Sequence, residues 1–250
     1  MDKEVAIRIE HLKKSYGKKE VLKDISLEVY KGELFGFVGV NGIGKSTTID
    51  CMIGVKKFDE GEIILNNYDI VKDPVLAKKE FGYIASEPDC YEVMTGYNYL
   101  SFIAGVYKVD KTYFKEKANE LLNKLQFNEA DLRLPIKSYS HGMKQKICII
   151  ASLIHNPSIW ILDEPTVGLD ILSVEALIQL MKDFVKEGNT IFLTSHNIDL
   201  VSDICDRVAI INKGYVVKTN DLSGGKASRR TLKKEFLSIF QNVEGENKDA

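Results

Sequence analysis

Two spacings of hydrophobic residues occur along this chain, and they predict strands towards its two ends and helices in its middle. Apolar side chains occupy every second position in residues 5–10 and 25–30, which is typical of half-buried strands. A further short strand is expected at residues 61–67. The run between the first two strands is rich in lysine and has a turn glycine at Gly17, so we expect a solvated hairpin surface there. Together these segments predict an antiparallel N-terminal part.

Three uninterrupted apolar runs predict the buried strands of a second, parallel part. They cover residues 33–39, 158–163 and 190–195, and each is too short for a helix. A helix is expected between the last two runs, over residues 171–188, and a closing hairpin over residues 207–217. Because helices separate the buried strands, the sheet should be parallel and covered on both faces.

The middle of the chain, residues 74–155, has mostly helical spacing. Apolar residues mark one face of a helix predicted over residues 112–127. Another helix is expected over residues 140–157, with Ser140 as its N-cap and a proline after its end. The fold class predicted is therefore α/β, with a parallel sheet, an N-terminal antiparallel β subdomain and an inserted α-helical subdomain.

Composition and charge narrow the class of protein. The 250 residues include 34 Lys and Arg against 36 Asp and Glu, a formal net charge of −2 that argues against a general nucleic-acid binder. No apolar run approaches the roughly 18 residues of a membrane span, and no signal-peptide pattern is expected at the N-terminus. The four cysteines form no CxxC pair, so we expect buried thiols rather than disulfides or a zinc site.

The first chemical motif follows the first buried run. Residues 39–46 read GVNGIGKS, which fits the pattern GxxxxGK[ST], and the chain continues as a predicted helix. Glycines let successive backbone N–H groups turn towards phosphate oxygens, and the helix N-terminus adds the positive end of its dipole. The bland alternative, a chance glycine-rich turn, is disfavoured by this strand–loop–helix context. The sequence therefore predicts a P-loop NTPase core.

Within this loop, Lys45 can reach the β- and γ-phosphates of a nucleotide, and the Ser46 hydroxyl is a ligand of the type that Mg²⁺ accepts. The predicted nucleotide contacts are Gly39, Val40, Asn41, Gly42, Ile43, Gly44, Lys45, Ser46 and Thr47.

Carboxylates follow the buried run at residues 158–163. Asp163 ends this run and Glu164 comes next, at the carboxyl edge of the sheet where ligands of open α/β sheets gather. We expect Asp163 to reach the Mg²⁺ held by Ser46, through water, and Glu164 to orient or deprotonate an attacking water. A solvated acidic turn is the alternative, and the apolar run that leads into it disfavours that interpretation. His196 follows the next buried strand, where a γ-phosphate contact is favoured over a purely structural role.

With these motifs in order, the sequence over about residues 3–220 resembles the nucleotide-binding subunit of ABC (ATP-binding cassette) transporters. GVNGIGKST resembles the family's Walker A motif and IWILDE its Walker B motif with the catalytic glutamate, Glu164. PTVGLD, which ends at Asp170, resembles the D-loop, and TSH, which ends at His196, resembles the H-loop. The resemblance implies ATP and Mg²⁺ as cofactors, and it places Tyr16 where the family stacks an aromatic ring on adenine.

Two motifs depart from the family pattern. The signature LSGGQ is represented by YSHGMKQ, in which Ser140 and Gly142 match. Physically, Ser140 caps a helix whose N–H groups can receive an anion. The resemblance implies that this helix points at the γ-phosphate held by a second cassette, so that two ATP molecules lie between two subunits. At the position of the family's usual Mg²⁺-contacting glutamine stands Ser86, which is shorter, so a contact through water or from Glu87 is expected.

The function implied is an ATP-hydrolysing subunit that drives transport through a separately encoded transmembrane permease. Such a chain would work as a homodimer or heterodimer of cassettes, in the cytoplasm and peripheral on the inner face of the cell membrane. We expect the ATPase domain at residues 1–220, its helical subdomain at about 88–155, and an extension at 221–250. A soluble ABC-type ATPase acting on nucleic acid or ribosomes, and a low-turnover regulatory module, are the alternatives; no nucleic acid is expected as a partner.

Two further surfaces have open interpretations. Residues 90–102 contain apolar and aromatic candidates for the permease contact, but we expect most of these aromatic rings to form the core of the helical subdomain. Residues 226–234 carry five positive charges, which more often mark a solvated helix face than a contact with anionic lipid headgroups. The polar end at residues 241–250 is expected to fray.

Overall fold

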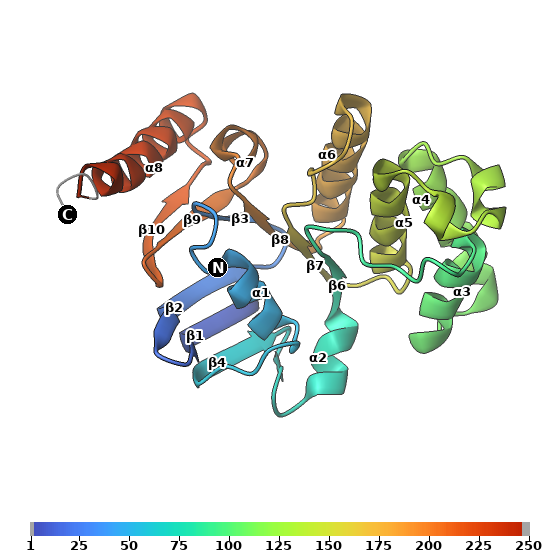
Figure 1. Cartoon of the computed structure of the whole chain (residues 1–250), viewed down its shortest axis with the longest axis horizontal. Helices are drawn as coiled ribbons and strands as arrows, with labels where there is room; N and C mark the ends of the chain where they lie inside the picture. Colours follow the sequence, from blue (N-terminus) through green and yellow to red (C-terminus); the bar gives the residue numbers. More distant parts are fainter. Residues whose placement is uncertain (1–2, 247–250) are drawn as a thin grey trace.

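The computed structural model describes the backbone of residues 3–246 and the side chains of residues 3–240. Among these residues, ten strands form one sheet in the order β5-β4-β1-β2-β10-β9-β3-β8-β7-β6 (Figure 1). The antiparallel part contains β1 (Val5–Tyr16), β2 (Lys19–Tyr30), β4 (Glu60–Leu65) and β5 (Tyr68–Asp69). The parallel part contains β3 (Leu34–Val38), β6 (Phe81–Ile84), β7 (Ile159–Asp163), β8 (Thr190–Ser195) and β9 (Arg207–Asn212), with β10 (Tyr215–Asp221) antiparallel to β9.

Helices lie beside this sheet and connect its strands. Those that follow strands of the parallel part, or precede them, are α1 (Lys45–Met52), α2 (Pro74–Glu80), α6 (Ile171–Lys186) and α7 (Ile198–Ile204). Those of the helical region are α3 (Gly96–Val106), α4 (Lys111–Lys124) and α5 (His141–Leu153), with short 3₁₀ turns at Glu129–Arg133 and Ile136–Ser138. Figure 1 shows α3, α4 and α5 grouped at one end of the molecule, and α8 (Lys226–Glu246) at the other.

Both faces of the parallel strands are buried, as their unbroken apolar runs predict. Trp160 and Leu162 face one hydrophobic cluster, which includes side chains of the helical region, whereas Ile161 and Phe192 face a second cluster on the side of β1 and β2. Each such fully buried side chain contributes about 1.5–3 kcal/mol. The Trp160 indole N–H donates to the Ser152 hydroxyl at 3.0 Å, so its one polar atom is satisfied. The predicted fold class is confirmed.

The first hairpin is longer than the sequence predicted. The lysines of the expected solvated hairpin surface lie on two long strands, because β1 and β2 stay paired up to Ser15 opposite Glu20 and Tyr16 opposite Lys19. Gly17, with φ of +59°, then makes the tight turn. The strands were underestimated because their outer residues are charged on both sides of the pleat, which removes the apolar alternation that marks a strand.

The region expected to be mostly helical contains a strand near its start. Residues 81–84 form β6, which pairs in parallel with β7. Gly82 lies so close to α5 that a Cβ atom there would be 2.0 Å from the carbonyl oxygen of Ser152. Four residues with a central glycine give no periodic signal, so only the pairing with β7 identifies the strand.

The aromatic rings between residues 90 and 102 were also misplaced. Tyr99 is buried in the core, but Tyr91, Tyr97 and Phe102 are exposed. The expectation that most of these rings form the core is therefore wrong. The core of the helical region is filled instead by aliphatic side chains of α4 and α5, such as Leu121 and Ile147.

The C-terminal helix α8 packs on the cassette through Leu232, through the partly buried Phe236, Ile239 and Phe240, and through several ion pairs. Leu232 is fully buried. Arg229 and Lys233 of the basic run pair with Asp203 at 3.3 Å and with Asp199 at 2.5 Å, both on α7. The helix continues to Glu246, through part of the polar end that was expected to fray, and residues 247–250 lie outside the described residues. Within residues 3–246, none of the helices combines the length and apolar character that crossing a membrane requires.

Candidate functional site

The loop between β3 and α1 turns sharply because its glycines adopt backbone conformations that other residues avoid. Gly42 has φ of +77° and Gly44 has φ of +119°. At Gly44 a Cβ atom would also lie 2.8 Å from a methyl carbon of Leu22. The helix α1 then begins at Lys45 with no side chain capping its first amides and no acidic residue in its first turn. Its N-terminal N–H groups are therefore free to receive an anion.

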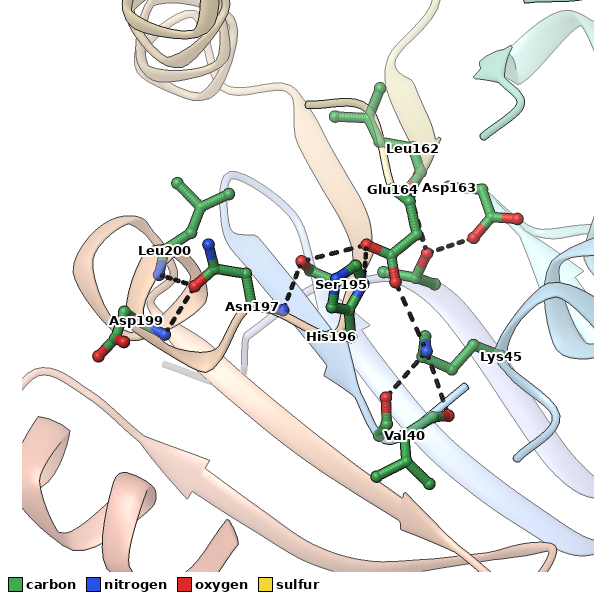
Figure 2. A network of polar contacts seen from close by, with 12 residues as sticks. Val40, Lys45, Leu162, Asp163, Glu164, Ser195, His196, Asn197, Asp199 and Leu200 are labelled. Carbon is green, nitrogen blue, oxygen red and sulfur yellow. Dashed lines mark hydrogen bonds and ion pairs between the residues drawn. The ribbon is translucent and has the colours of Figure 1, made fainter. Parts of the chain in front are cut away.

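The ammonium group of Lys45 lies inside this loop. Its Nζ donates to the carbonyl oxygens of Gly39 at 2.8 Å and Val40 at 3.4 Å, and it lies 3.5 Å from Oε1 of Glu164 (Figure 2). The side chain is only 6% exposed. A buried ammonium with these partners is held where phosphate oxygens could replace the neutral carbonyls.

The two carboxylates at the end of β7 have different surroundings. Asp163 is buried and accepts a hydrogen bond from the Thr194 hydroxyl. Glu164 has φ of +49°, in the left-handed region, and its N–H donates to the carbonyl oxygen of Thr194 at 3.2 Å. Non-glycine residues adopt this conformation at a cost of about 1–3 kcal/mol, and such positions cluster at functional sites. Here the turn directs the Glu164 side chain to Lys45.

Neighbouring side chains hold the Glu164 carboxylate through one of its two oxygen atoms. Oε2 lies 2.9 Å from Nδ1 of His196 and accepts from the Ser195 hydroxyl at 3.3 Å (Figure 2). Oε1 is buried and has no hydrogen-bond partner among the described residues, although it makes the ion-pair contact with Lys45. A buried acceptor of this kind is costly unless a donor such as water reaches it.

These groups surround one cavity of about 410 Å³, which forms where four separate segments of the chain end near one another. Its walls come from the glycine loop, the segment after β6, the turn after β7 and the end of β8. The lining residues are Asn41, Gly42, Gly44, Lys45, Ser46, Thr47, Ser86, Glu87, Glu164, Val167 and His196. Most of the residues predicted from the loop motif and the strand ends are thus brought together.

Other predicted residues lie next to the cavity without lining it. Gly39 and Val40 hold Lys45 through their carbonyl oxygens, and Ile43 packs against the core. Tyr16 stands at the end of β1 with its ring half exposed, and the ammonium groups of Lys14 and Lys56 lie 5.3 and 5.6 Å from its centroid.

Ser140 and Gly142 lie on a different surface, at the start of α5. The Ser140 hydroxyl accepts a hydrogen bond from the N–H of Met143 at 3.2 Å, so it caps the helix as predicted. The ring of His141 packs on Gly168, where a Cβ atom would be 2.2 Å from His141 Cδ2. Neither Ser140 nor Gly142 lines the cavity around Lys45.

Several residues of the site escaped the sequence analysis. Thr194 and Ser195 hold the two carboxylates, and Val167 lines the cavity. The pairing of Asp163 with Thr194 in neighbouring parallel strands is what brings the hydroxyls to the carboxylates. The sequence did contain a signal for these residues, because two hydroxyl residues end a buried strand. That signal indicates a contact with the carboxylates only when the order of the strands is known.

Most of the side-chain atoms near the glycine loop that could bind a metal ion are oxygen atoms. Ser46, Ser86 and Glu87 line the cavity, and Asp163 ends β7 directly before Glu164. Hydroxyl and carboxylate oxygens in a site with few carboxylates are the donor set that suits Mg²⁺ bound together with substrate phosphates. The residues present therefore fit a magnesium nucleotide.

Comparison with known proteins agrees with this geometry. A family model described as "ABC transporter" matches residues 22–167. The chain belongs to the ABC transporter family. It is 37% identical over 211 residues to the linearmycin resistance ATP-binding protein LnrL of Bacillus subtilis, covering 84% of this chain and 68% of LnrL. It is 30% identical over 231 residues to the lantibiotic transport ATP-binding protein SrtF of Streptococcus pyogenes, covering 92% of this chain and 97% of SrtF.

Among solved structures, an ATP-binding subunit of an ABC transporter superposes with a TM-score of 0.86 at 30% identity. The match covers 92% of this chain and 99% of that subunit. This cassette is therefore an ATP-binding subunit of the exporter-like type and an ATP hydrolase.

Proposed function

We propose that two cassettes close over two ATP molecules and that hydrolysis reopens them, which drives transport through a separate membrane-spanning partner. One observation carries the proposal: the cavity holds Lys45 and Glu164, whereas the capped start of α5 at Ser140 lies outside it. In this proposal a single copy would carry two halves of a phosphate site on different surfaces. A second copy, related by a two-fold axis, would complete each half.

In this proposal the glycine loop and the start of α1 bind the ATP phosphates through backbone N–H groups. Lys45 exchanges the carbonyl oxygens of Gly39 and Val40 for β- and γ-phosphate oxygens. Tyr16, the last residue of β1, would stack on adenine. The family resemblance supports this placement, and the half-exposed ring leaves room for it.

Glu164 is the proposed general base. Its Oε1 is buried and lacks a hydrogen-bond partner, so it can accept a proton from the attacking water. His196 and Ser195 hold Oε2, which fixes the orientation of the carboxylate. His196 is half exposed, so it can also contact the γ-phosphate from the open side.

Mg²⁺ would be held by Ser46, with Asp163 and Ser86 acting directly or through water. The ion, when bound, neutralises charge that develops on the phosphates. Because Ser86 and Glu87 both line the cavity, either can supply the oxygen that the usual glutamine provides. Asp163 keeps its position through the Thr194 hydroxyl.

The proposed contact for the permease is the exposed apolar surface at the start of the helical region, which we call the α3 patch. Its residues have large apolar side chains that are exposed: Tyr91, Val93, Tyr97 and Phe102. Val93 is 88% exposed, and Tyr91 packs edge-on against Phe102 with centroids 5.7 Å apart. Exposed apolar clusters of this kind mark interaction surfaces. Binding to such a partner would place the subunit on the inner face of the membrane.

The names of two relatives support transport as the outcome. LnrL is named for linearmycin resistance and SrtF for lantibiotic transport. We infer that this cassette also serves a transporter, whose substrate site belongs to the membrane partner. The ATPase domain would comprise residues 1–220, with the helical subdomain at about 88–155 and the extension at 221–250.

The replacement Glu164→Gln tests the catalytic proposal. We expect it to bind ATP normally, to form an ATP-dependent dimer in analytical ultracentrifugation, and to lose turnover by about 100-fold or more, since a general base contributes that much. Glu175→Gln, which changes an exposed carboxylate of α6, is the control and should keep turnover. A Glu164→Gln protein that stays monomeric at saturating ATP, or that keeps its turnover, would contradict the proposal.

A substitution that introduces a charge into the α3 patch tests the proposed permease contact. We expect Val93→Asp to abolish co-purification with a polytopic membrane protein from detergent-solubilised membranes, while ATP binding is unchanged. Val75→Asp, at an exposed valine of α2, should leave co-purification intact. If the wild-type chain instead sediments with ribosomes and no membrane protein accompanies it, the transport assignment is wrong.

A further inference from the structure

Two cysteine side chains meet between the segment after β6 and α5. Cys148 Sγ lies 3.8 Å from the carbonyl oxygen of Asp89, the residue before Cys90, and both cysteines pack against the same hydrophobic cluster. All four cysteines are free thiols, as predicted. Cys51 and Cys205 are buried as expected, but Cys90 and Cys148 are only partly buried. The structure therefore separates two inert thiols from an adjacent, accessible pair.

The surroundings of the pair give its two members different chemistry. The hydrogen bond from Cys148 is the main cause that lowers the pKa of the Cys90 thiol, and the Lys144 ammonium adds to it, against the effects of burial and of Glu92 and Asp89. The same hydrogen bond, together with burial, raises the pKa of Cys148. In the switch proposed below, Cys90 is therefore given the role of the attacking thiolate and Cys148 that of the thiol that resolves its oxidised form.

A small oxidant can reach this place. Cys148 and Asp89 line a cavity of about 250 Å³ between the segment after β6 and α5. By contrast, burial raises the pKa of Cys51 to about 11, and Cys205 is enclosed by the core. Reaction with peroxide follows thiolate character and exposure, so it should select the Cys90–Cys148 pair over Cys51 and Cys205.

A bond between the two sulfur atoms would connect two parts of the proposed ATP site. Ser86 and Glu87, which line the nucleotide cavity, belong to the same short segment as Cys90. Cys148 lies on α5, the helix that begins at the Ser140 cap. Both parts must adjust when ATP binds and the dimer closes.

We propose that Cys90 and Cys148 form a redox switch: a hydroperoxide converts them into a disulfide that fastens the segment of residues 85–95 to α5 and slows ATP hydrolysis. The effect on rate rests on the proposed roles of Ser86, Glu87 and Ser140. The formation of the disulfide does not depend on those roles.

The chemistry balances with hydrogen peroxide as oxidant. The Cys90 thiolate attacks one peroxide oxygen, the O–O bond breaks, and the departing hydroxide takes a proton to become water. Cys90 is then a sulfenic acid. The Cys148 sulfur attacks that sulfur, the S–O bond breaks, and a second water leaves with the Cys148 proton. Two thiols are oxidised and one peroxide is reduced to two waters, and a dithiol reductant reverses the step.

The test exposes the full-length chain to hydrogen peroxide, followed by alkylation and peptide mapping by mass spectrometry. We expect a peptide pair joined through Cys90 and Cys148, and ATP turnover about tenfold lower, the size of effect that follows from slight misplacement of groups at a reaction site. Dithiothreitol should restore both the thiols and the turnover.

Matched variants separate the switch from general oxidative damage. Cys90→Ser and Cys148→Ser should each keep the turnover of the reduced protein and resist peroxide, whereas Cys205→Ala should remain sensitive. Absence of the joined peptide pair overturns the proposed disulfide, whatever the transport function is. A disulfide that forms without changing turnover overturns the switch, and loss of turnover that persists in both serine variants assigns the damage to another site.

Discussion

Lys45 and Glu164 show how single residues prepare the site for a charged ligand. Both side chains are nearly buried, at 6% and 12% exposed, and Oε1 of Glu164 has no hydrogen-bond partner among the described residues. Buried charges are stable only when paired, and this pair is long at 3.5 Å. The arrangement therefore lowers the stability of the protein without nucleotide, and a bound phosphate with its attacking water would restore that stability.

Replacing the ammonium of Lys45 tests this interpretation. We expect Lys45→Ala to weaken ATP binding by about 10- to 100-fold, because a charge-assisted hydrogen bond contributes about 1.5–3 kcal/mol. Isothermal titration calorimetry with Mg²⁺ measures the affinity. Lys57→Ala, which removes an exposed lysine nearby in the sequence, should bind ATP as the wild type does. Unchanged affinity in Lys45→Ala would contradict the phosphate-loop assignment.

At the scale of elements, the ends of helices decide where anions can bind. The N-termini of α1 and α5 differ in kind: α1 begins without a side-chain cap, whereas Ser140 caps α5 through the N–H of Met143. At α5 the hydroxyl satisfies one amide and leaves the others of the first turn available. The ring of His141, packed on Gly168, joins this helix to the turn that precedes α6.

The two roles of Ser140, as cap and as proposed anion contact, can be separated with a second cap. We expect Ser140→Ala and Thr95→Ala each to lower the free energy of unfolding by about 1 kcal/mol, since Thr95 caps α3 through the N–H of Asn98. Urea unfolding measures this loss. Only Ser140→Ala should also weaken ATP-dependent dimerisation of the Glu164→Gln protein in ultracentrifugation. Equal dimerisation in the two variants would limit Ser140 to a structural cap.

At the scale of the whole molecule, the order of strands assembles the site. β3 lies beside β8, and β8 beside β7. The loop with Lys45, the turn with Glu164 and the segment after β8 with His196 therefore meet at the carboxyl ends of these strands. The helical region attaches beyond β6 at that side, and α8 attaches beyond β10 at the opposite side (Figure 1). The helical region and α8 thus lie on opposite sides of the strands that carry the site (Figure 1).

The attachment of α8 to the molecule depends on Leu232 more than on its charges. Exposed ion pairs contribute about 0–1 kcal/mol, whereas truncating a fully buried leucine costs about 2–5 kcal/mol. We expect Leu232→Ala to lower the free energy of unfolding by about 3 kcal/mol in urea denaturation. Leu237→Ala, at a position that is 49% exposed, should change it by less than about 0.5 kcal/mol. Similar values for the two variants would mean that α8 is not held by its buried face.

Local patterns predicted those features that depend on local physics. The glycine loop, the cap at Ser140, the buried strands and the helices α4, α5 and α6 each leave a periodic or chemical signal within a few residues. Two features were missed where that signal was absent: β6 is short and contains a glycine, and the outer half of the first hairpin, whose strands are longer than predicted, is charged. The exposed rings of Tyr91, Tyr97 and Phe102 were misjudged because hydrophobicity alone does not say what covers a side chain.

The sequence by itself determined the family, the phosphate loop and the identities of the acidic and histidine side chains. Only the tertiary structure decided which of them meet: it placed Thr194 against Asp163, left Oε1 of Glu164 without a hydrogen-bond partner among the described residues, and brought Cys148 to the carbonyl oxygen of Asp89, next to Cys90. The physical reason is that each of these contacts crosses between segments far apart in the chain. Their proximity depends on strand order and on the packing of helices against the sheet, which no local pattern of residues contains.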